Sequence, residues 1–253
     1  INFNNMIERL KKQQDKLLVA ERYSAWESVA RKLAHEIKNP LTPIQLSIDR
    51  LKVKYSDQIK DEKNDFRKYL DTIDRQIVDI KKLVNEFSDF ARMPAPILKK
   101  VKISNLITRS INFYKMSDKK LNLSLKDNTN GDSYIKGDGE QINRVFINLI
   151  KNSIEAIDEK KQKNEGLQGK ITIEINRNNE YIVVEMLDNG IGFNDTKNIA
   201  KPYFTTKKEG TGLGLPIVTK IINDHGGDIN FLKNSEGAEI IISFPIYSWK
   251  KKF

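Results

Sequence analysis

The sequence predicts a multidomain protein in which a helical hairpin, dimerising into a four-helix bundle, is followed by an α/β two-layer sandwich. Two observations lead to this fold class. Over residues 1–92 glycine is absent, and apolar residues recur at the three- and four-residue intervals of amphipathic helices. After the segment Met93–Pro96, short alternating stretches typical of strands are mixed with longer stretches of helical spacing. A length of 253 residues is sufficient for two ordinary domains.

The N-terminal part is expected to be helical throughout. Phe3, Leu10 and Leu17 stand seven residues apart, which favours a short parallel coiled coil. Prolines 94 and 96 then interrupt the helical pattern and indicate a hinge. The expected segments are a coiled-coil linker over 1–24, a dimerisation domain over 25–93, a hinge over 94–100 and a second domain over 101–249.

The dimerisation domain contains two apolar seams, and the polar stretch Lys52–Asn64 between them is expected to form a loop. The seams consist of Leu33, Ile37, Leu41, Ile44, Ile48 and Leu51 in the first helix and of Phe66, Leu70, Ile73, Ile77, Ile80, Val84 and Phe87 in the second. These seams offer more apolar surface than one hairpin can bury. We therefore expect a homodimer formed through the hairpin, with its four helices packed as a bundle.

The second domain mixes both periodicities, and a sheet covered by helices on one face is expected. Strands are predicted over 121–126, 171–175, 181–187, 228–232 and 239–244, and helices over 104–115, 139–160 and 216–224. His225 follows the last of these helices and precedes two glycines, so it is interpreted as a cap at a helix end that favours cations.

The amino-acid composition and the net charge limit the kinds of partner and ligand that this protein is expected to have. Apolar residues make up 38% of the chain and charged residues 31%, which suits folded cores with much water-exposed surface. The net charge of +10 would suit nucleic acid or anionic lipid, but the lysines are dispersed among Glu and Asp. We therefore expect no nucleic-acid partner, although a basic surface also suits an acidic protein. The absence of cysteine excludes disulfides and thiolate metal sites, and no apolar run approaches the roughly 18 residues of a membrane span.

Polar residues in the predicted second domain have the spacing of a nucleotide site. Asn148 and Asn152 are one helical turn apart, so both amides lie on one face, and an amide oxygen is a suitable ligand for Mg²⁺. Asp188 ends a predicted strand and is followed by Gly190 and Gly192, which allow backbone to approach a planar ring. For an isolated pair of asparagines, solvation on a polar helix face would be the favoured interpretation, and the Asp-Asn-Gly run could be a simple turn.

A second glycine-rich loop opens a helix. Gly210, Gly212 and Gly214 come directly before an apolar helix that has Pro216 in its first turn. Backbone N–H groups at a helix start form an anion site for phosphates, whereas a glycine-rich stretch alone is usually a linker.

These motifs, in this order, resemble the sensor histidine kinases of two-component signalling. The resemblance is carried by His35-Glu36-Ile-Lys-Asn39-Pro, by the Asn pair and by the two glycine loops, and it covers nearly the whole chain. Residues 25–47, 91–96 and 205–207 are similar to the NtrY-type branch. The second domain resembles the Bergerat-type ATP-binding fold that these kinases share with gyrase, Hsp90 and MutL.

The resemblance implies roles for particular residues. His35, which helical geometry places on the solvent side of its seam, would be the phosphorylated nucleophile. Glu36 would accept its proton, and Asn39 would hold the phosphoryl group or a water molecule. The implied ligands are ATP and Mg²⁺, with Asn152 as the metal ligand. The residues implied to contact ATP are Asn148, Asn152, Asp188, Gly190, Gly192, Thr206, Lys207, Gly210, Gly212, Gly214 and Leu215.

Some assignments stay open on the sequence alone. Lys207 could contact the γ-phosphate or be one more surface lysine. Glu155 stands where many sensor kinases have Lys or Arg, which puts a phosphate contact from that position in doubt. The resemblance also leaves open whether transfer runs within or between subunits.

Three functions compete. The leading one is a protein-histidine kinase that transfers phosphate from ATP to His35 and then to an aspartate in the receiver domain of a response regulator, with a further activity that removes it. The others are a GHKL-type ATPase without phosphohistidine and a non-enzymatic dimeric scaffold. Because the chain begins at Ile1 with a segment that resembles the end of a HAMP linker, we expect a cytoplasmic fragment of a parent protein anchored in the bacterial inner membrane.

Overall fold

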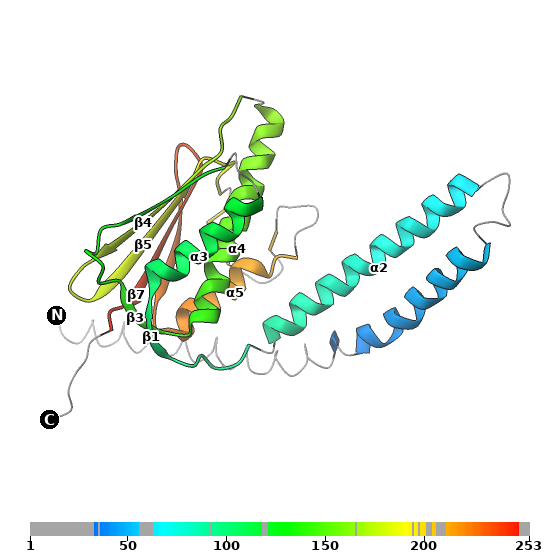
Figure 1. Cartoon of the computed structure of the whole chain (residues 1–253), viewed down its shortest axis with the longest axis horizontal. Coiled ribbons are helices and arrows are strands. Elements are labelled where there is room, and N and C mark those ends of the chain that lie inside the picture. Colours follow the sequence, from blue (N-terminus) through cyan, green and yellow to red (C-terminus); the bar gives the residue numbers. More distant parts are fainter. Residues whose placement is uncertain are drawn as a thin grey trace. The chain divides into compact units, whose positions relative to one another are not determined.

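The computed structural model divides into two compact units between Pro94 and Ala95 (Figure 1). It describes residues 33–34, 36–55, 63–91, 93–117, 121–164, 166–193, 195–196, 198–200, 204–205 and 211–247. The predicted coiled coil over residues 1–24 lies outside the described residues.

The first unit contains two helices, over residues 36–55 and over α2 (Lys63–Ala91) (Figure 1). Their shared core is formed by Leu41 and Ile48 from the first helix and by Leu70 and Ile77 from α2, with Phe66 packed against it. The spacing of seven residues within each pair brings one side chain to the interface every two turns. The helical hairpin predicted from the apolar spacing is therefore confirmed.

The loop between these helices is shorter than predicted. The first helix continues through Tyr55 and α2 begins at Lys63, so both ends of the expected loop Lys52–Asn64 are helical. Lys52 forms ion pairs of 3.0 Å with Asp71 and with Asp74 across the hairpin. These hydrogen bonds raise the pKa of Lys52 above its usual value. The start of the polar stretch is compatible with helix because Lys52 has two acidic partners on the facing helix.

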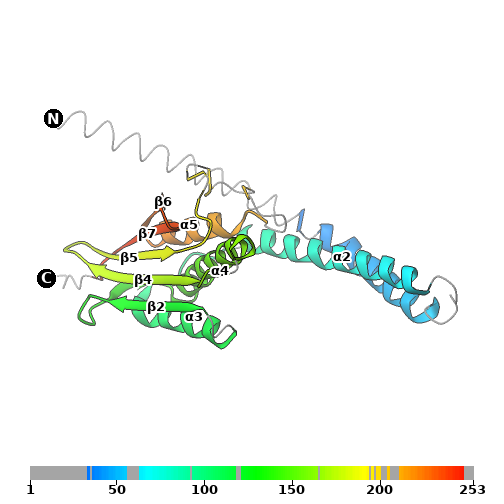
Figure 2. The same cartoon turned by 90° about the horizontal axis from the view of Figure 1, so that it is seen from above.

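The second unit is an α/β two-layer sandwich. Its main sheet has the spatial order β2-β4-β5-β7-β6, with β2 parallel to β4 and the other neighbours antiparallel. The strands are β2 (Asn122–Asp127), β4 (Lys170–Arg177), β5 (Tyr181–Asp188), β6 (Asp228–Lys233) and β7 (Ala238–Pro245). Helices α3 (Ile103–Ser117), α4 (Gly139–Lys163) and α5 (Gly214–Asp224) cover one face (Figures 1 and 2). All five predicted strands and all three predicted helices of this domain are present, with small differences at their ends.

The central strands bury every second side chain beneath the helices, as a half-covered sheet requires. In β5 the buried series runs through Ile182, Val184 and Met186 and ends at Asp188. The carboxylate thus occupies a position where the pattern predicts an apolar side chain. A buried carboxylate is costly unless donors surround it, so its environment is the starting point for the site.

Two short strands were not predicted. β1 (Lys99–Lys102) pairs antiparallel with β3 (Tyr134–Gly137) in a separate sheet, and β1 begins inside the range expected to be hinge. Lysine is uncommon in strands, and a four-residue strand gives little periodicity to detect. In the structure, the Lys100 ammonium lies 4.1 Å from the centre of the Tyr134 ring, a cation–π contact that offsets the low strand propensity.

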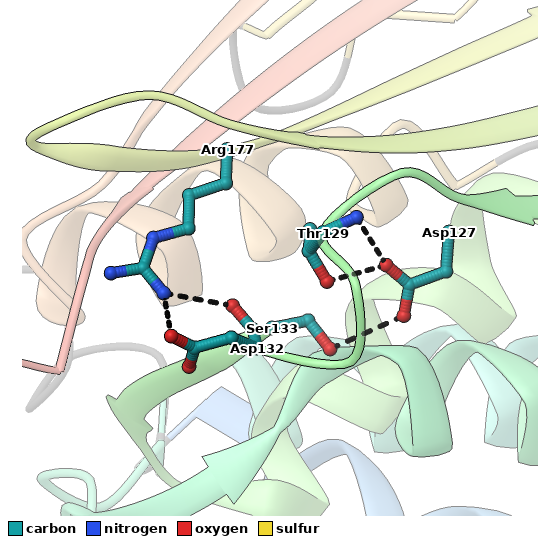
Figure 3. Close-up of polar contacts among 5 residues, drawn as sticks. All are labelled: Asp127, Thr129, Asp132, Ser133 and Arg177. Carbon is teal, nitrogen blue, oxygen red and sulfur yellow. Dashed lines mark hydrogen bonds and ion pairs between the residues drawn. The ribbon is translucent and has the colours of Figure 1, made fainter.

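A polar network fixes the turn between β2 and β3 (Figure 3). One oxygen of Asp127 accepts hydrogen bonds from the backbone N–H of Thr129 at 3.0 Å and from its hydroxyl at 2.5 Å. Arg177, the last residue of β4, forms an ion pair with Asp132 in the same turn. Burial by itself would raise the pKa of Asp127, but the hydrogen bonds from Thr129 outweigh it, so the pKa lies below its usual value. The turn thereby holds the small sheet beside the edge of the main one.

Candidate nucleotide-binding site

The asparagine pair lies on α4, in the middle of the helical layer. Asn148 and Asn152 are both half-buried. The Asn148 amide nitrogen donates to the carbonyl of Arg144 at 2.9 Å, which orients the side chain. A Cβ atom added to Gly214 would lie 3.7 Å from Asn148 Oδ1, so this oxygen faces the first residue of α5. The packing of α4 on α5 therefore brings the asparagine helix and the start of α5 together.

Asp188 is surrounded by donors. Its Oδ1 accepts hydrogen bonds from the backbone N–H groups of Gly190 at 2.9 Å and Ala238 at 3.2 Å. Its Oδ2 accepts one from the hydroxyl of Ser153, on α4, at 2.6 Å. Only 8% of Asp188 is exposed. A carboxylate has about four lone-pair positions, so one position on Oδ2 is left after these three bonds.

The glycines near Asp188 allow three segments to approach one another closely. A Cβ atom at Gly190 would lie 2.8 Å from the backbone of Ala156 on α4. Gly192 has a φ of +72°, and a Cβ atom there would lie 2.7 Å from the carbonyl oxygen of Gly237. Gly237, in the turn between β6 and β7, would itself place a Cβ atom 2.2 Å from the backbone oxygen of Asp188. Side chains at these positions would force apart the walls around the carboxylate.

The second glycine loop leads into α5, whose N-cap residue makes no side-chain capping hydrogen bond. Gly212 has a φ of +68°, the left-handed conformation that glycine adopts without strain. α5 begins at Gly214, and its N-cap, Leu213, makes no side-chain capping hydrogen bond. The first-turn N–H groups of this helix are thus without a side-chain cap, and such a helix start attracts anions.

The structure describes only some of the other residues that were expected at the site. Glu36 and Asn39 are exposed on the first helix, and Leu215 is half-buried in the first turn of α5. His35, Thr206, Lys207 and Gly210 lie outside the described residues.

The acidic residue at position 155 has a local partner. Glu155 Oε1 is 3.7 Å from the ammonium of Lys151, one turn earlier on α4. Burial, and then the negative charge of Glu155, raise the pKa of Tyr114, whose hydroxyl donates to the carbonyl of Ile147 at 3.1 Å. Lys151 and Glu155 thus form an oppositely charged pair on α4.

Sequence reasoning missed Ser153, Gly237 and the N–H of Ala238. Ser153 and Asp188 are 35 residues apart, and their contact depends on how α4 packs over β5. One signal was available, because a serine beside Asn152 interrupts the otherwise apolar buried face of α4.

His225 joins the ends of two helices. It is the C-cap of α5, as predicted, and its Nδ1 lies 2.7 Å from the carbonyl oxygen of Ile221. Its Nε2 accepts the backbone N–H of Asp138 at 2.9 Å, so the ring is neutral with its proton on Nδ1 rather than a cation. Asp138 is the N-cap of α4 and also accepts the N–H of Ile97 at 3.0 Å. Burial would raise the pKa of Asp138, but its backbone donors lower it below the usual value.

The donor set fits magnesium. Among the described residues no three His, Asp or Glu side chains come together in a group that could hold a metal ion. Mg²⁺ commonly keeps several waters and is completed by substrate phosphates, so it needs few protein ligands. The amide oxygens on one face of α4, near an uncapped helix start, match that requirement.

Two family models match the chain. Residues 25–96 match the His Kinase A (phospho-acceptor) domain, and residues 137–248 match the histidine kinase-, DNA gyrase B- and HSP90-like ATPase domain. This chain belongs to the sensor histidine kinases. The helical hairpin is its phosphoacceptor domain and the sandwich is its ATPase domain, which confirms the predicted fold class.

Individual proteins of the NtrY type are similar in sequence to most of this chain. The NtrY-like sensor histidine kinase of Rickettsia felis is 40% identical over 248 residues, covering 96% of this chain and 40% of the relative. The nitrogen regulation protein NtrY of Azorhizobium caulinodans is 39% identical over 229 residues, covering 87% of this chain and 28% of the relative. The chain therefore spans less than half the length of these relatives.

Solved histidine kinases have the same fold. The catalytic domain of the histidine kinase ThkA matches with a TM-score of 0.52 and 27% identity, over 59% of this chain and 95% of that one. A structure of ThkA in complex with the response regulator TrrA matches with a TM-score of 0.63 and 25% identity, over 95% of this chain and 67% of that one. None of the described helices is long and apolar enough to cross a membrane.

Proposed function

We propose that this chain transfers the γ-phosphoryl group of ATP to His35 and then to an aspartate of a response regulator. The observation that carries the proposal is the environment of Asp188, where three donors leave one acceptor position in a nearly buried site. Such a carboxylate can accept the amine of adenine. The Asn pair on α4 and the uncapped start of α5 lie on the same layer, where a triphosphate requires oxygen ligands and N–H donors.

The proposed chemistry divides between the two domains. A nitrogen of neutral His35 attacks the γ-phosphorus, a P–N bond forms, and the bond to the bridging oxygen breaks to release ADP. Glu36 takes the proton from the other ring nitrogen or stabilises the imidazolium. Asn152, with Asn148 beside it, would hold Mg²⁺, which neutralises phosphate charge when bound. The backbone N–H groups after Gly212 would bind phosphate oxygens.

Incubation with γ-labelled ATP tests this proposal. A kinase is expected to give protein-bound label that is stable in base and labile in acid, as a phosphohistidine is. Release of free phosphate without labelled protein would instead establish a GHKL-type ATPase. Absence of both would indicate the dimeric scaffold.

We also propose that the hairpin forms a homodimer. In the single chain, Ile37, Ile44 and Leu51 are 40%, 46% and 40% exposed, and Ile73 and Ile80 on α2 are 46% and 43% exposed. Within each helix these residues lie seven positions apart, and they form an exposed row next to the buried side chains of Leu41 and Ile48. A second copy that covers this row would complete a four-helix bundle, because one hairpin leaves it in water.

Substitution of one residue in that row should separate the subunits. Ile44→Asp places a charge in the proposed interface, and sedimentation of the whole chain is expected to change from dimer to monomer. Val53→Asp is the matched control, since Val53 is an apolar residue of the same helix that is 84% exposed and outside the row. A wild-type chain that sediments as a monomer would contradict the four-helix bundle.

We propose that Asn39 serves dephosphorylation of the regulator more than loading of His35. It is exposed one turn after His35, and its neutral amide can orient a water molecule but cannot act as the general base. Asn39→Ala is expected to reduce release of phosphate from the phosphorylated regulator roughly tenfold or more and autophosphorylation much less. Equal losses in both assays would instead indicate a role in helix shape or in transfer geometry.

A place for this chain in the cell is also proposed. Its similarity to NtrY-like sensor kinases, which are more than twice as long, supports a cytoplasmic location within a longer parent protein of the bacterial inner membrane.

A further inference from the structure

We propose that Ser153 is a specificity-determining residue that positions the Asp188 carboxylate for an adenine base and against a guanine base. The inference rests on the proposed function, because it assumes that Asp188 meets the base of ATP. It goes further by assigning base selectivity to a side chain outside the motifs described above.

The hydrogen bonds on Asp188 are distributed unequally. Both donors on Oδ1 are backbone N–H groups, that of Gly190 at 2.9 Å and that of Ala238, the first residue of β7, at 3.2 Å. From the described residues Oδ2 receives one hydrogen bond, from the hydroxyl of Ser153 at 2.6 Å. Of these three hydrogen bonds to Asp188, the one from Ser153 is therefore the one that a side-chain substitution can remove. Without it, no described residue would donate to Oδ2, and the carboxylate would be held through Oδ1 alone.

Ser153 is well placed to act as a fixed donor. It is 2% exposed and lies in the helix that carries the asparagine pair. A serine has one hydroxyl proton, and here that proton is given to Asp188, so Oδ2 is left with acceptor capacity only. Its remaining lone pair can take the exocyclic amine of adenine. The bond from Ser153 thus determines both the direction and the hydrogen-bonding character of that oxygen.

Guanine presents the opposite pattern at the same ring position. Its carbonyl oxygen would face Oδ2, and two acceptors would repel each other. The Ser153 hydroxyl could relieve this conflict only by leaving Asp188 and donating to the base, which would remove the sole bond on Oδ2. A buried polar group left unpaired is costly, so the arrangement discriminates strongly between the two bases.

Two variants of the whole chain test the inference. Ser153→Ala removes the donor, and Ser153→Cys keeps the side-chain size with a much weaker one. We expect Ser153→Ala to weaken ATP binding roughly tenfold with little change for GTP, and Ser153→Cys to fall between it and wild type. Ser110→Ala is the matched control, because Ser110 is a buried helical serine, 1% exposed, whose hydroxyl oxygen is 3.1 Å from each of two acceptors, the Leu106 carbonyl oxygen and Asn143 Oδ1. It should bind both nucleotides as wild type does.

Kinetics separate positioning from a purely structural role. In Ser153→Ala the KM for ATP should rise while phosphorylation at saturating ATP stays near wild type, because the residue acts at the base and not at the γ-phosphate. A fall in kcat together with a lower unfolding temperature, at an unchanged ATP-to-GTP ratio, would assign Ser153 to folding and overturn the inference.

A double-mutant cycle with Asp188→Asn gives the second test. If Ser153 acts through Asp188, then adding Ser153→Ala to Asp188→Asn should change ATP affinity less than twofold. A further tenfold loss would mean that Ser153 acts independently, contrary to the inference. Failure of wild-type chain to bind ATP would contradict the proposed function itself. Normal wild-type binding with an unaltered Ser153→Ala variant would contradict only the role of Ser153.

Discussion

Asp188→Asn should weaken ATP binding at least a hundredfold. The site presents two backbone N–H donors to Oδ1 and the Ser153 hydroxyl to Oδ2. An asparagine oxygen can take the place of Oδ1, but its amide nitrogen then points where Oδ2 was. The exocyclic amine of adenine, itself a donor, would then face the amide N–H of the asparagine. If the asparagine side chain were rotated the other way, its amide nitrogen would instead face the two backbone N–H groups. Either arrangement leaves unpaired donors in a buried site, at a cost of roughly 3 kcal/mol, which is about a hundredfold in affinity.

The measurement is equilibrium binding of ATP to the wild-type and variant chains, with thermal unfolding as a check on folding. Asp158→Asn provides the control, because Asp158 is an exposed aspartate of α4 whose partner is Lys161, outside the site. It should bind ATP normally. Unchanged affinity in Asp188→Asn would remove this residue from recognition of the base.

The parts of this site that sequence predicts are those with a short-range signature. Glycine spacing located the loop after Asp188 and the start of α5, because a tight turn constrains neighbouring residues along the chain. Two of the three donors to Asp188 come from α4, 35 residues before it, and from the start of β7, 50 residues after it. The packing of α4 over the sheet and the pairing of β5 with β7 bring them together, and no local pattern contains that information.

The same distinction applies to the fold. The long alternating strands and amphipathic helices were predicted because burial of one face repeats along each element. β1 was missed because its lysines are stabilised by contacts with distant residues such as Tyr134. The ends of the hairpin loop were misplaced for a related reason, since the polar residue Lys52 is held in helix by Asp71 and Asp74 on the facing helix. In each case a tertiary contact outweighs the local preference.

His35→Gln should reduce labelling of the protein by γ-labelled ATP to below about 1% of wild type. The glutamine amide keeps a polar side chain of similar length but has no nucleophilic nitrogen, so no P–N bond can form. ATP binding should stay within about twofold of wild type, because the predicted ligands of the nucleotide all belong to the ATPase domain. Asp188→Asn is the complementary variant, which keeps the nucleophile and loses the nucleotide.

Labelling and nucleotide binding measured on the same preparations separate the two steps of the reaction. A mixture of the two inactive variants, allowed to exchange subunits, then reports the direction of transfer. Label returns if the ATPase domain of one subunit serves His35 of its partner, and it stays absent if transfer runs within a subunit. Full labelling of His35→Gln alone would mean that another residue accepts the phosphoryl group, and the only other histidine, His225, is buried with both ring nitrogens hydrogen-bonded. Loss of ATP binding in His35→Gln would contradict the assignment of nucleotide binding to the ATPase domain and of the phosphorylated histidine to the hairpin.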